Sequence, residues 1–317
     1  MSTSGSTSAN LNLRAAPSTA AAIQATLPSG TGLTILDSEG GWLRVRVDAT
    51  GREGFVSAKY VRLPAAEIVS GYLREDAEIV AAALAPAEKK QPAPGSGDAG
   101  AVAARIWNAY GGLLSTVARR LEIEPETGVG VMSVESGGTA FVQGRMVIRF
   151  ENHVFFDRWG KANPDVFARH FRFDAAARWK GHEFRPSTDQ PWRACHGKQA
   201  GEWEVFSFAE GLDRRAARMS ISMGLPQVMG FNFAALGFPG VDEMFAAFSD
   251  PAAGERAQVV GMFDFVKGPR TTSPMLEALR ARDWVAFAKR YNGTGQAEAY
   301  GARLKAAYGA AKGLVAV

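Results

Sequence analysis

The chain has 317 residues, of which 46% are hydrophobic and 21% are charged, and these fractions are typical of a folded globular protein. The length is too great for one small module and predicts two domains, one of ordinary size and one small. Cys195 is the only cysteine, which excludes an intramolecular disulfide and favours an ordinary buried thiol. The formal net charge of +4 suits a polyanionic partner, and both nucleic acid and an acidic cell-wall polymer fit that description.

The first ten residues are polar and rich in serine and threonine. They have neither the basic region nor the apolar region of a signal peptide, so we expect a disordered leader over residues 1–10. No run elsewhere is long and apolar enough to span a membrane. We therefore expect a protein that is made in the cytoplasm and does not insert into a membrane. If it acts outside the cell membrane, something else must release it.

Residues 11–63 alternate short apolar runs with turn residues, which is the pattern of an all-β domain. Leu43, Val45 and Val47 face one side of a predicted strand, and the two arginines between them face the other side. Five such strands predict a small barrel.

Several positions of this segment resemble a bacterial SH3 domain, a module that binds peptidoglycan when it is attached to cell-wall hydrolases. The matching positions are Leu11-Asn12-Leu13-Arg14, Pro17-Ser18-Thr19, Leu27 with Gly30, Gly41-Trp42-Leu43 with Val45, and Gly54-Phe55-Val56 with Tyr60. Phe55 departs from the pattern, because a tryptophan is more usual there. The resemblance implies a cell-wall-binding domain over residues 11–63, and the alternative is a barrel with no ligand of its own.

Two segments separate this domain from the rest of the chain. Residues 64–85 are rich in alanine and apolar residues and suit a helix that bridges two domains. Residues 86–100 are rich in proline and glycine and are predicted to be a linker. The second domain then occupies residues 101–317, which is long enough to bury about 70% of the surface of its unfolded chain.

This second domain opens with an amphipathic helix predicted over residues 102–121, and a shorter helix follows over residues 125–135. Pro125 suits the first turn of the shorter helix, and Gly137 and Gly138 stop it. Val129 and Met132 give it an apolar stripe, so we expect this helix to be buried.

Glu135 therefore sits in the last turn of a buried helix. Burial and the negative end of the helix dipole both disfavour the charged form of a carboxylate at that place. A carboxyl group that stays protonated near neutral pH is what a general acid needs. The alternative is a glutamate that simply extends from the helix end into solvent.

An extended segment over residues 141–151 follows, and Gly144 suits a hairpin turn within it. Residues 152–202 are mixed in pattern and hold all four histidines in or beside them. From Trp203 onward the pattern is helical. The predicted helices cover residues 203–220, a segment that starts near Asn232, and residues 252–266, 273–281, 283–291 and 296–309. The fold class is therefore α+β, in which a mostly α domain with a small β insertion follows a small all-β barrel.

A glutamate that ends a helix, followed by a small β element and then by helices, resembles the lysozyme-like superfamily. Residues 135–138 resemble the Glu-Ser motif of goose-type lysozymes and lytic transglycosylases, and residues 222–230 resemble their Ser-x-Gly-Leu-x-Gln-x-Met segment. Tyr291 and Asn292 resemble their Tyr-Asn pair. The closer resemblance is to the phage-type N-acetylmuramidase family of modular endolysins. It rests on Phe150-Glu151-x-His153-x-Phe155, Met229-Gly230-Phe231-Asn232, and the succession Phe265-Val266, Trp284 and Tyr291-Asn292-Gly293.

This resemblance implies a peptidoglycan hydrolase that cleaves the β-1,4 bond between N-acetylmuramic acid and N-acetylglucosamine. Glu135 is then the general acid that protonates the leaving oxygen. Met223 and Pro226 depart from the family pattern, which affects details of saccharide binding rather than the chemistry.

Most glycosidases need a second carboxylate. Glu151 is our candidate, because it closes the extended segment that follows Glu135. A structural ion pair of Glu151 with Arg145 or Arg149 is the alternative. Asp157 is a poorer candidate, and the N-acetyl or 6-hydroxyl group of the substrate can also complete the reaction, as in lytic transglycosylases.

Four further residues are predicted to bind substrate or to shape its site: Ser222, Gln227, Tyr291 and Asn292. Gln227 and Asn292 suit hydrogen bonds to sugar amides, and Tyr291 suits stacking on a sugar or a hydrogen bond near Glu135. Each of them can instead serve packing alone.

We predict no cofactor and no metal site, because the four histidines lack the short paired spacings of metal ligands. They are His153, His170, His182 and His196. The predicted partner is peptidoglycan and not nucleic acid, because no basic helix or nucleic-acid-binding motif is present. We expect a monomer. The competing functions are a lytic transglycosylase and a non-catalytic wall-binding protein.

Overall fold

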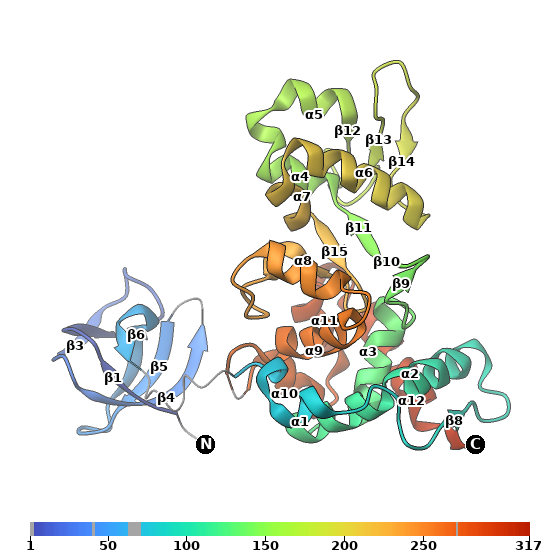
Figure 1. The fold of residues 1–317 in the computed structure, drawn as a ribbon. Helices are drawn as coiled ribbons and strands as arrows, with labels where there is room; N and C mark the ends of the chain where they lie inside the picture. The colour runs from blue at the N-terminus through green and yellow to red at the C-terminus, as the bar shows by residue number, and fades with distance from the viewer. Residues whose placement is uncertain (1–2, 40–41, 63–70, 271) are drawn as a thin grey trace. The chain divides into compact units, whose positions relative to one another are not determined.

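The computed structural model describes residues 3–39, 42–62, 71–270 and 272–317 (Figure 1). The chain divides into two compact units, Met1–Gly71 and Tyr72–Val317. The first unit is all β, and the second is mostly helical with small sheets, which confirms the predicted fold class. Among the described residues, no helix is both long enough and apolar enough to cross a membrane.

The first unit is a curled antiparallel sheet of seven strands in the order β3-β2-β6-β5-β4-β1-β7 (Figure 1). Its core consists of leucines and valines that alternate along the strands, as the sequence predicts for β5. The strands are β1 (Thr3–Thr7), β2 (Leu11–Arg14), β3 (Ile23–Leu27), β4 (Gly32–Glu39), β5 (Trp42–Val47), β6 (Glu53–Ser57) and β7 (Val61–Arg62).

The prediction of a disordered leader was wrong for residues 3–7, which form β1 between β4 and β7. Thr7 is buried there, and its side-chain oxygen accepts a hydrogen bond from the backbone N–H of Thr31 at 2.9 Å. A strand that completes an open sheet edge needs only its backbone hydrogen bonds, so a polar Ser/Thr segment can form one without an apolar pattern.

The second unit has two hydrophobic cores. The helical core lies among α2 (Gly97–Leu121), α3 (Pro125–Glu135), α9 (Gly254–Lys267), α10 (Pro274–Arg280), α11 (Trp284–Tyr291) and α12 (Ala297–Lys312). The mixed core lies among short strands and helices between β11 and α8. These are β11 (Ile148–Phe150), α4 (Asn152–Arg158), α5 (Pro164–His170), β12 (Phe171–Arg172), β13 (Glu183–Phe184), β14 (Arg193–Ala194), α6 (Gln199–Leu212), α7 (Arg214–Met219), β15 (Ile221–Met223), β16 (Val228–Met229) and α8 (Val241–Ser249).

The segment before α2 belongs to the helical core and is not a free linker. Leu73 in the 3-10 turn η2 (Leu73–Glu75) and Ile79 in α1 (Ala77–Ala81) are both buried in that core. The backbone N–H of Leu73 donates a 2.6 Å hydrogen bond to the buried carboxyl of Asp264.

Further along, β8 (Lys90–Gln91) pairs with β17 (Val315–Ala316). The linker prediction for residues 86–100 therefore failed at β8 and at the first turn of α2, because backbone pairing and helix docking are not visible in composition. The expected bridge over residues 64–85 lies partly outside the described residues.

The small β elements lie where the sequence places them. Strand β9 (Phe141–Val142) pairs with β10 (Arg145–Met146) through a turn in which Gly144 has a φ of 74°. Strand β11 then pairs with β15, and β15 pairs with β16, so that Arg149 lies opposite Ser222. The predicted helix over residues 203–220 is two helices, α6 and α7, because Asp213 caps the second one with its side chain. No α-helix starts at Asn232, which ends the 3-10 turn η4 (Gly230–Asn232).

Glycines set the position of α3. A Cβ on Gly130 would lie 3.1 Å from the backbone nitrogen of Tyr308, so the absence of a side chain lets α3 approach the backbone of α12. At the end of the helix, Gly137 and Gly138 have φ values of 60° and 75°. The N–H of Gly138 donates to the carbonyl of Met132 at 3.2 Å, which closes the helix.

Gly138 and Gly137 make a matched pair for a stability test. Alanine at either position adopts an unfavourable left-handed conformation, which costs about 1 kcal/mol. At Gly138 the added Cβ would also lie 2.3 Å from Cγ1 of Ile106, whereas at Gly137 the nearest atom is 3.8 Å away. We expect Gly138→Ala to lower the free energy of unfolding in urea by about 1–3 kcal/mol more than Gly137→Ala does. Equal losses in the two variants would contradict the tight packing of this turn against α2.

Candidate active site

Glu135 ends α3, and its carboxyl group is enclosed at the contact with α12 although the residue as a whole is half-buried. The hydroxyl of Tyr300 in α12 donates a hydrogen bond to Oε1 of Glu135. The side chain of Asn292, just after α11, also hydrogen bonds to this carboxyl group. Three helices of the helical core therefore converge on one carboxyl.

Burial raises the pKa of Glu135 to about 8. The hydrogen bond from Asn292 and the positive charge of Arg303 act in the opposite direction, and the desolvation of the carboxyl outweighs them. Glu135 is thus protonated at neutral pH. Because Tyr300 donates to Oε1, the proton of the acid belongs on Oε2, where it is available for transfer.

Tyr291 is held by its ring and by its hydroxyl. Its ring stacks on Phe287 at a centroid distance of 5.1 Å and meets Phe265 edge-on at 5.5 Å. The hydroxyl donates a 2.9 Å hydrogen bond to the carbonyl of Pro226. Burial and then the charge of Glu135 raise the pKa of Tyr291 well above its ordinary value. These contacts make Tyr291 a residue that ties α11 to the loop before β16. The predicted contact of Tyr291 with sugar stays a prediction.

Ser222 and Gln227 contact each other across the turn between β15 and β16. The hydroxyl of Ser222 donates to Oε1 of Gln227 at 2.8 Å, and Nε2 of Gln227 donates to the carbonyl of Gly224 at 2.8 Å. Gln227 also has a φ of 48°, which is uncommon for a residue with a side chain. Both polar atoms of Gln227 thus have partners inside the turn. The predicted contact of these two residues with sugar stays a prediction.

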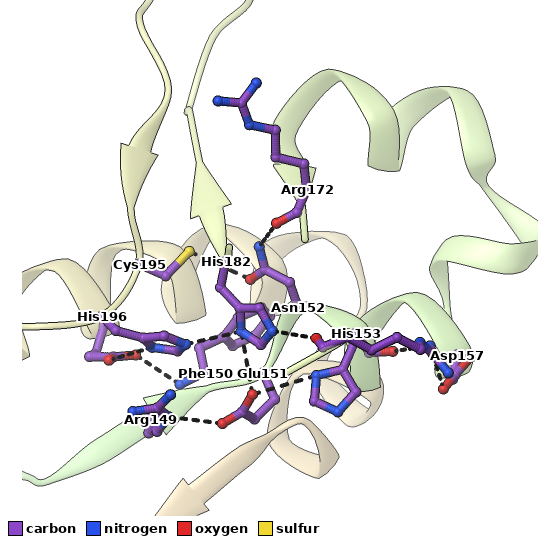
Figure 2. Close-up of polar contacts among 12 residues, drawn as sticks. Arg149, Phe150, Glu151, Asn152, His153, Asp157, Arg172, His182, Cys195 and His196 are labelled. Atoms are coloured by element: carbon purple, nitrogen blue, oxygen red, sulfur yellow. Dashed lines mark hydrogen bonds and ion pairs between the residues drawn. The ribbon is translucent and has the colours of Figure 1, made fainter. Parts of the chain in front are cut away.

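Glu151 lies at the end of β11, and basic groups surround its carboxylate (Figure 2). Oε1 accepts a hydrogen bond from Nε of Arg149 at 2.9 Å, as the ion-pair alternative expected. Oε2 faces Nδ1 of His182 at 3.3 Å and Nδ1 of His153 at 3.5 Å. None of the contacts described for Glu151 involves a partner of Glu135, so its role as the second carboxylate stays a prediction.

Three of the four histidines, His153, His182 and His196, form a connected network with Glu151 and Glu202 that the sequence did not indicate (Figure 2). Nδ1 of His182 lies 3.0 Å from Nε2 of His196, whose Nδ1 lies 3.0 Å from the buried carboxyl of Glu202. Burial lowers the pKa of both His153 and His182. Ligand atoms of Glu151, His153 and His182 lie within 4.8 Å of one another, which is a set able to hold a metal ion. The fold thus brings together a group of potential metal ligands, which the spacing of the histidines in the sequence did not predict.

The contacts of Cys195 and Asp157 bear on two other predictions. Cys195 is buried, and its Sγ donates to Oδ1 of Asn152 at 3.5 Å. Burial raises the pKa of this thiol to about 12, and Cys195 is the ordinary buried thiol that the sequence predicts. Asp157 pairs with Lys161 at 2.8 Å and with Arg178 at 2.9 Å, so it is a surface ion-pair residue.

Sequence reasoning missed Tyr300 and Arg303 at the active site. Both belong to α12, and Arg303 lies over the ring of Tyr300 at 5.1 Å. Tyr300 is buried on the α12 face that also carries Ala297, Gly301 and Leu304. A hydroxyl-bearing aromatic residue on a helix face of small and apolar residues is the sequence signal by which Tyr300 could have been found.

In comparisons with known proteins, two family models match parts of this chain. The family model described as N-acetylmuramidase matches residues 124–312, and the model of the bacterial SH3 domain matches residues 9–62. Among solved structures, the crystal structure of Burkholderia AP3 phage endolysin is similar, with 27% sequence identity and a TM-score of 0.48. That similarity covers 63% of this chain and 70% of the endolysin chain. No curated protein matches significantly.

The raised pKa of Glu135 has a consequence for stability. A carboxyl whose pKa is higher in the folded chain than its unfolded value of 4.5 contributes stability that is fully present below pH 4.5 and is lost as the pH rises toward 8. Glu135→Gln removes this loss. We expect the variant to gain stability relative to the wild type by up to about 1.4 kcal/mol per pH unit between pH 5 and 8. Urea unfolding at pH 5 and pH 9 measures this difference, and a difference that does not change with pH would contradict the buried, protonated carboxyl.

Proposed function

The chain belongs to the N-acetylmuramidase family, and we propose that it cleaves the β-1,4 bond between N-acetylmuramic acid and N-acetylglucosamine with Glu135 as the general acid. With its bacterial SH3 domain it is a modular peptidoglycan hydrolase. The observation that carries the proposal is the carboxyl of Glu135, which is enclosed at a helix end with a pKa of about 8. We propose further that it acts as a monomeric endolysin after release to the cell wall.

The groups around Glu135 have distinct tasks in this proposal. The Tyr300 hydroxyl fixes the carboxyl so that the proton on Oε2 faces the glycosidic oxygen. As that oxygen takes the proton, Glu135 becomes charged, and the hydrogen bond from Asn292 and the charge of Arg303 then stabilise it. The contacts with Asn292 and Arg303 are too weak to ionise Glu135 before the reaction, but they stabilise its carboxylate as the charge develops in the transition state.

Ser136 follows Glu135 and is the other polar group at this helix end. Its Oγ is buried and has no hydrogen-bond partner among the described residues. A buried hydroxyl without a partner is costly unless a ligand supplies one. We propose that a sugar oxygen is that partner, while Ser222, Gln227 and Tyr291 hold the β15–β16 turn in position for the saccharide.

The second step of the reaction has two candidates. In one, Glu151 activates water, which is the sequence-based prediction. In the other, the muramic acid completes the reaction with its own N-acetyl or 6-hydroxyl group. A second carboxylate lies about 5–9.5 Å from the acid in such enzymes, beyond the reach of a hydrogen bond, so the contacts of Glu135 do not distinguish the two candidates.

Mass spectrometry of muropeptides released from purified sacculi tests the assignment of Glu135. We expect the wild-type protein to release fragments that end in muramic acid. Glu135→Gln should lower the rate of this release by about 10²–10⁴-fold. Glu126→Gln, at the other end of α3, is the matched control and should keep the wild-type rate. Near-wild-type release by Glu135→Gln would reject Glu135 as the acid. Reducing ends indicate hydrolysis, and 1,6-anhydro ends indicate a transglycosylase.

A second prediction concerns the SH3 domain. The chain 72–317 contains the whole helical core, including Leu73 and Ile79, and should cleave soluble peptidoglycan fragments at the full rate. It should be retained less on intact sacculi than the full chain, because linked modules raise each other's effective concentration. Equal sedimentation of both proteins with sacculi would count against wall binding by the first unit. A chain of residues 101–317 should unfold more easily, because it lacks those two core residues.

A further inference from the structure

Glu151, His153 and His182 form a cluster of potential metal ligands beside the mixed core, and neither histidine has a task in the reaction proposed for Glu135 (Figure 2). Its members come from two segments: Glu151 lies between β11 and α4, His153 lies in the first turn of α4, and His182 precedes β13. The side chain of His182 is fully buried, and those of Glu151 and His153 are 14% and 24% exposed. The cluster is therefore a shielded site rather than a surface group.

The distances in this cluster are poor for hydrogen bonds and good for metal ligands. Oε2 of Glu151 lies 3.3 Å from Nδ1 of His182 and 3.5 Å from Nδ1 of His153, beyond the usual 2.7–3.2 Å of an N–H···O bond. Nδ1 of His153 is buried without a hydrogen-bond partner among the described residues. Two ligands at about 2.0–2.1 Å from a tetrahedral zinc ion lie about 3.3–3.4 Å apart. Both measured edges are close to that value.

The surrounding contacts orient the ligand atoms. Nε2 of His182 lies 2.8 Å from the carbonyl oxygen of Arg178, which can only accept, so Nε2 carries the proton and a neutral ring presents the Nδ1 lone pair to the cluster. A carbonyl that holds the second ring nitrogen is the usual support for a metal-binding histidine. The guanidinium of Arg149 occupies Oε1 of Glu151 and leaves Oε2 as a single ligand atom.

We propose that Glu151, His153 and His182 form a binding site for a divalent transition-metal ion, with zinc as the best fit. Two imidazole nitrogens and one carboxylate oxygen suit zinc. They do not suit magnesium or calcium, because both of these ions prefer oxygen ligands. Water takes the fourth position. The ion clamps the segment before β13 onto α4, and the two imidazoles approach each other as it binds, since their nitrogens are up to 4.8 Å apart.

His196 competes with the ion. Its Nε2 lies 3.0 Å from the same Nδ1 atom of His182, and one lone pair cannot both accept a hydrogen bond and bind a metal. Zinc binding therefore breaks the hydrogen bond between His182 and His196. Removing this competitor should leave the affinity for zinc unchanged or raise it.

The test uses untagged full-length protein stripped of metal with a chelator and titrated with ZnCl₂ by calorimetry. We expect one zinc ion per chain and a higher melting temperature in its presence. His153→Asn should lower the affinity by about 10-fold or more, and His196→Gln should not lower it. His170→Asn is the matched control, because His170 contacts the carbonyl of Arg185 and lies outside the cluster.

Two outcomes would overturn the proposal: the absence of stoichiometric zinc binding by the wild type, or equal affinity of the His153→Asn variant. Because His182 is fully buried, His153→Asn is the primary variant, and its circular dichroism without metal should match the wild type. Co²⁺ in place of Zn²⁺ provides a second readout, because the visible absorption of Co²⁺ reports four-coordinate binding. We expect this absorption in the wild type and not in the His153→Asn variant. The readout is metal binding and not wall lysis, so failure of this proposal leaves the assignment of Glu135 intact.

Discussion

The enclosure of one carboxyl group at the end of α3 is the constraint on which the rest of the active site depends. An ionised carboxylate is costly to bury, so Glu135 stays protonated unless charge and hydrogen bonds compensate. The enclosure itself depends on glycine: Gly130 lets α12 come close enough for Tyr300 to reach Oε1, and Gly138 turns the chain away directly after the carboxyl. Local packing, rather than a cationic partner in contact, therefore sets the acidity.

The two hydrophobic cores explain how distant segments meet at this carboxyl. Tyr291 and Phe141 pack against both the helical core and the mixed core, so they lie at the junction between them. The hydroxyl of Tyr291 extends this junction to the β15–β16 turn through the carbonyl of Pro226. Ser222 in β15 lies opposite Arg149 in β11, and Arg149 donates a hydrogen bond to Glu151. These contacts connect Tyr291 with the histidine cluster through the β15–β16 hairpin.

Features with a local cause were predictable from the sequence, and features that depend on distant partners were not. Pro125, the apolar stripe and the two glycines predict α3 and the environment of Glu135, because each acts within a turn of the helix. The strand β1 and the docking of Leu73 on Asp264 depend on partners far along the chain, and so their polar or Ala-rich sequences gave no warning. The same holds for His153 and His182, which are separated by the rest of α4, a 3-10 turn, α5 and β12, and for Tyr300, which reaches Glu135 only through helix packing.

The surroundings of Glu151 bear on how the sugar reaction ends. A base that activates water needs a free carboxylate oxygen that faces the substrate. In the structure, Oε1 is occupied by Arg149, and Oε2 faces two imidazole nitrogens. A metal ion on Oε2 would lower the basicity of the Glu151 carboxylate and so weaken it as a general base. Zinc binding at this cluster therefore argues against water activation by Glu151. If zinc binds there, the acetamido or 6-hydroxyl group of the muramic acid is the remaining candidate to complete the reaction.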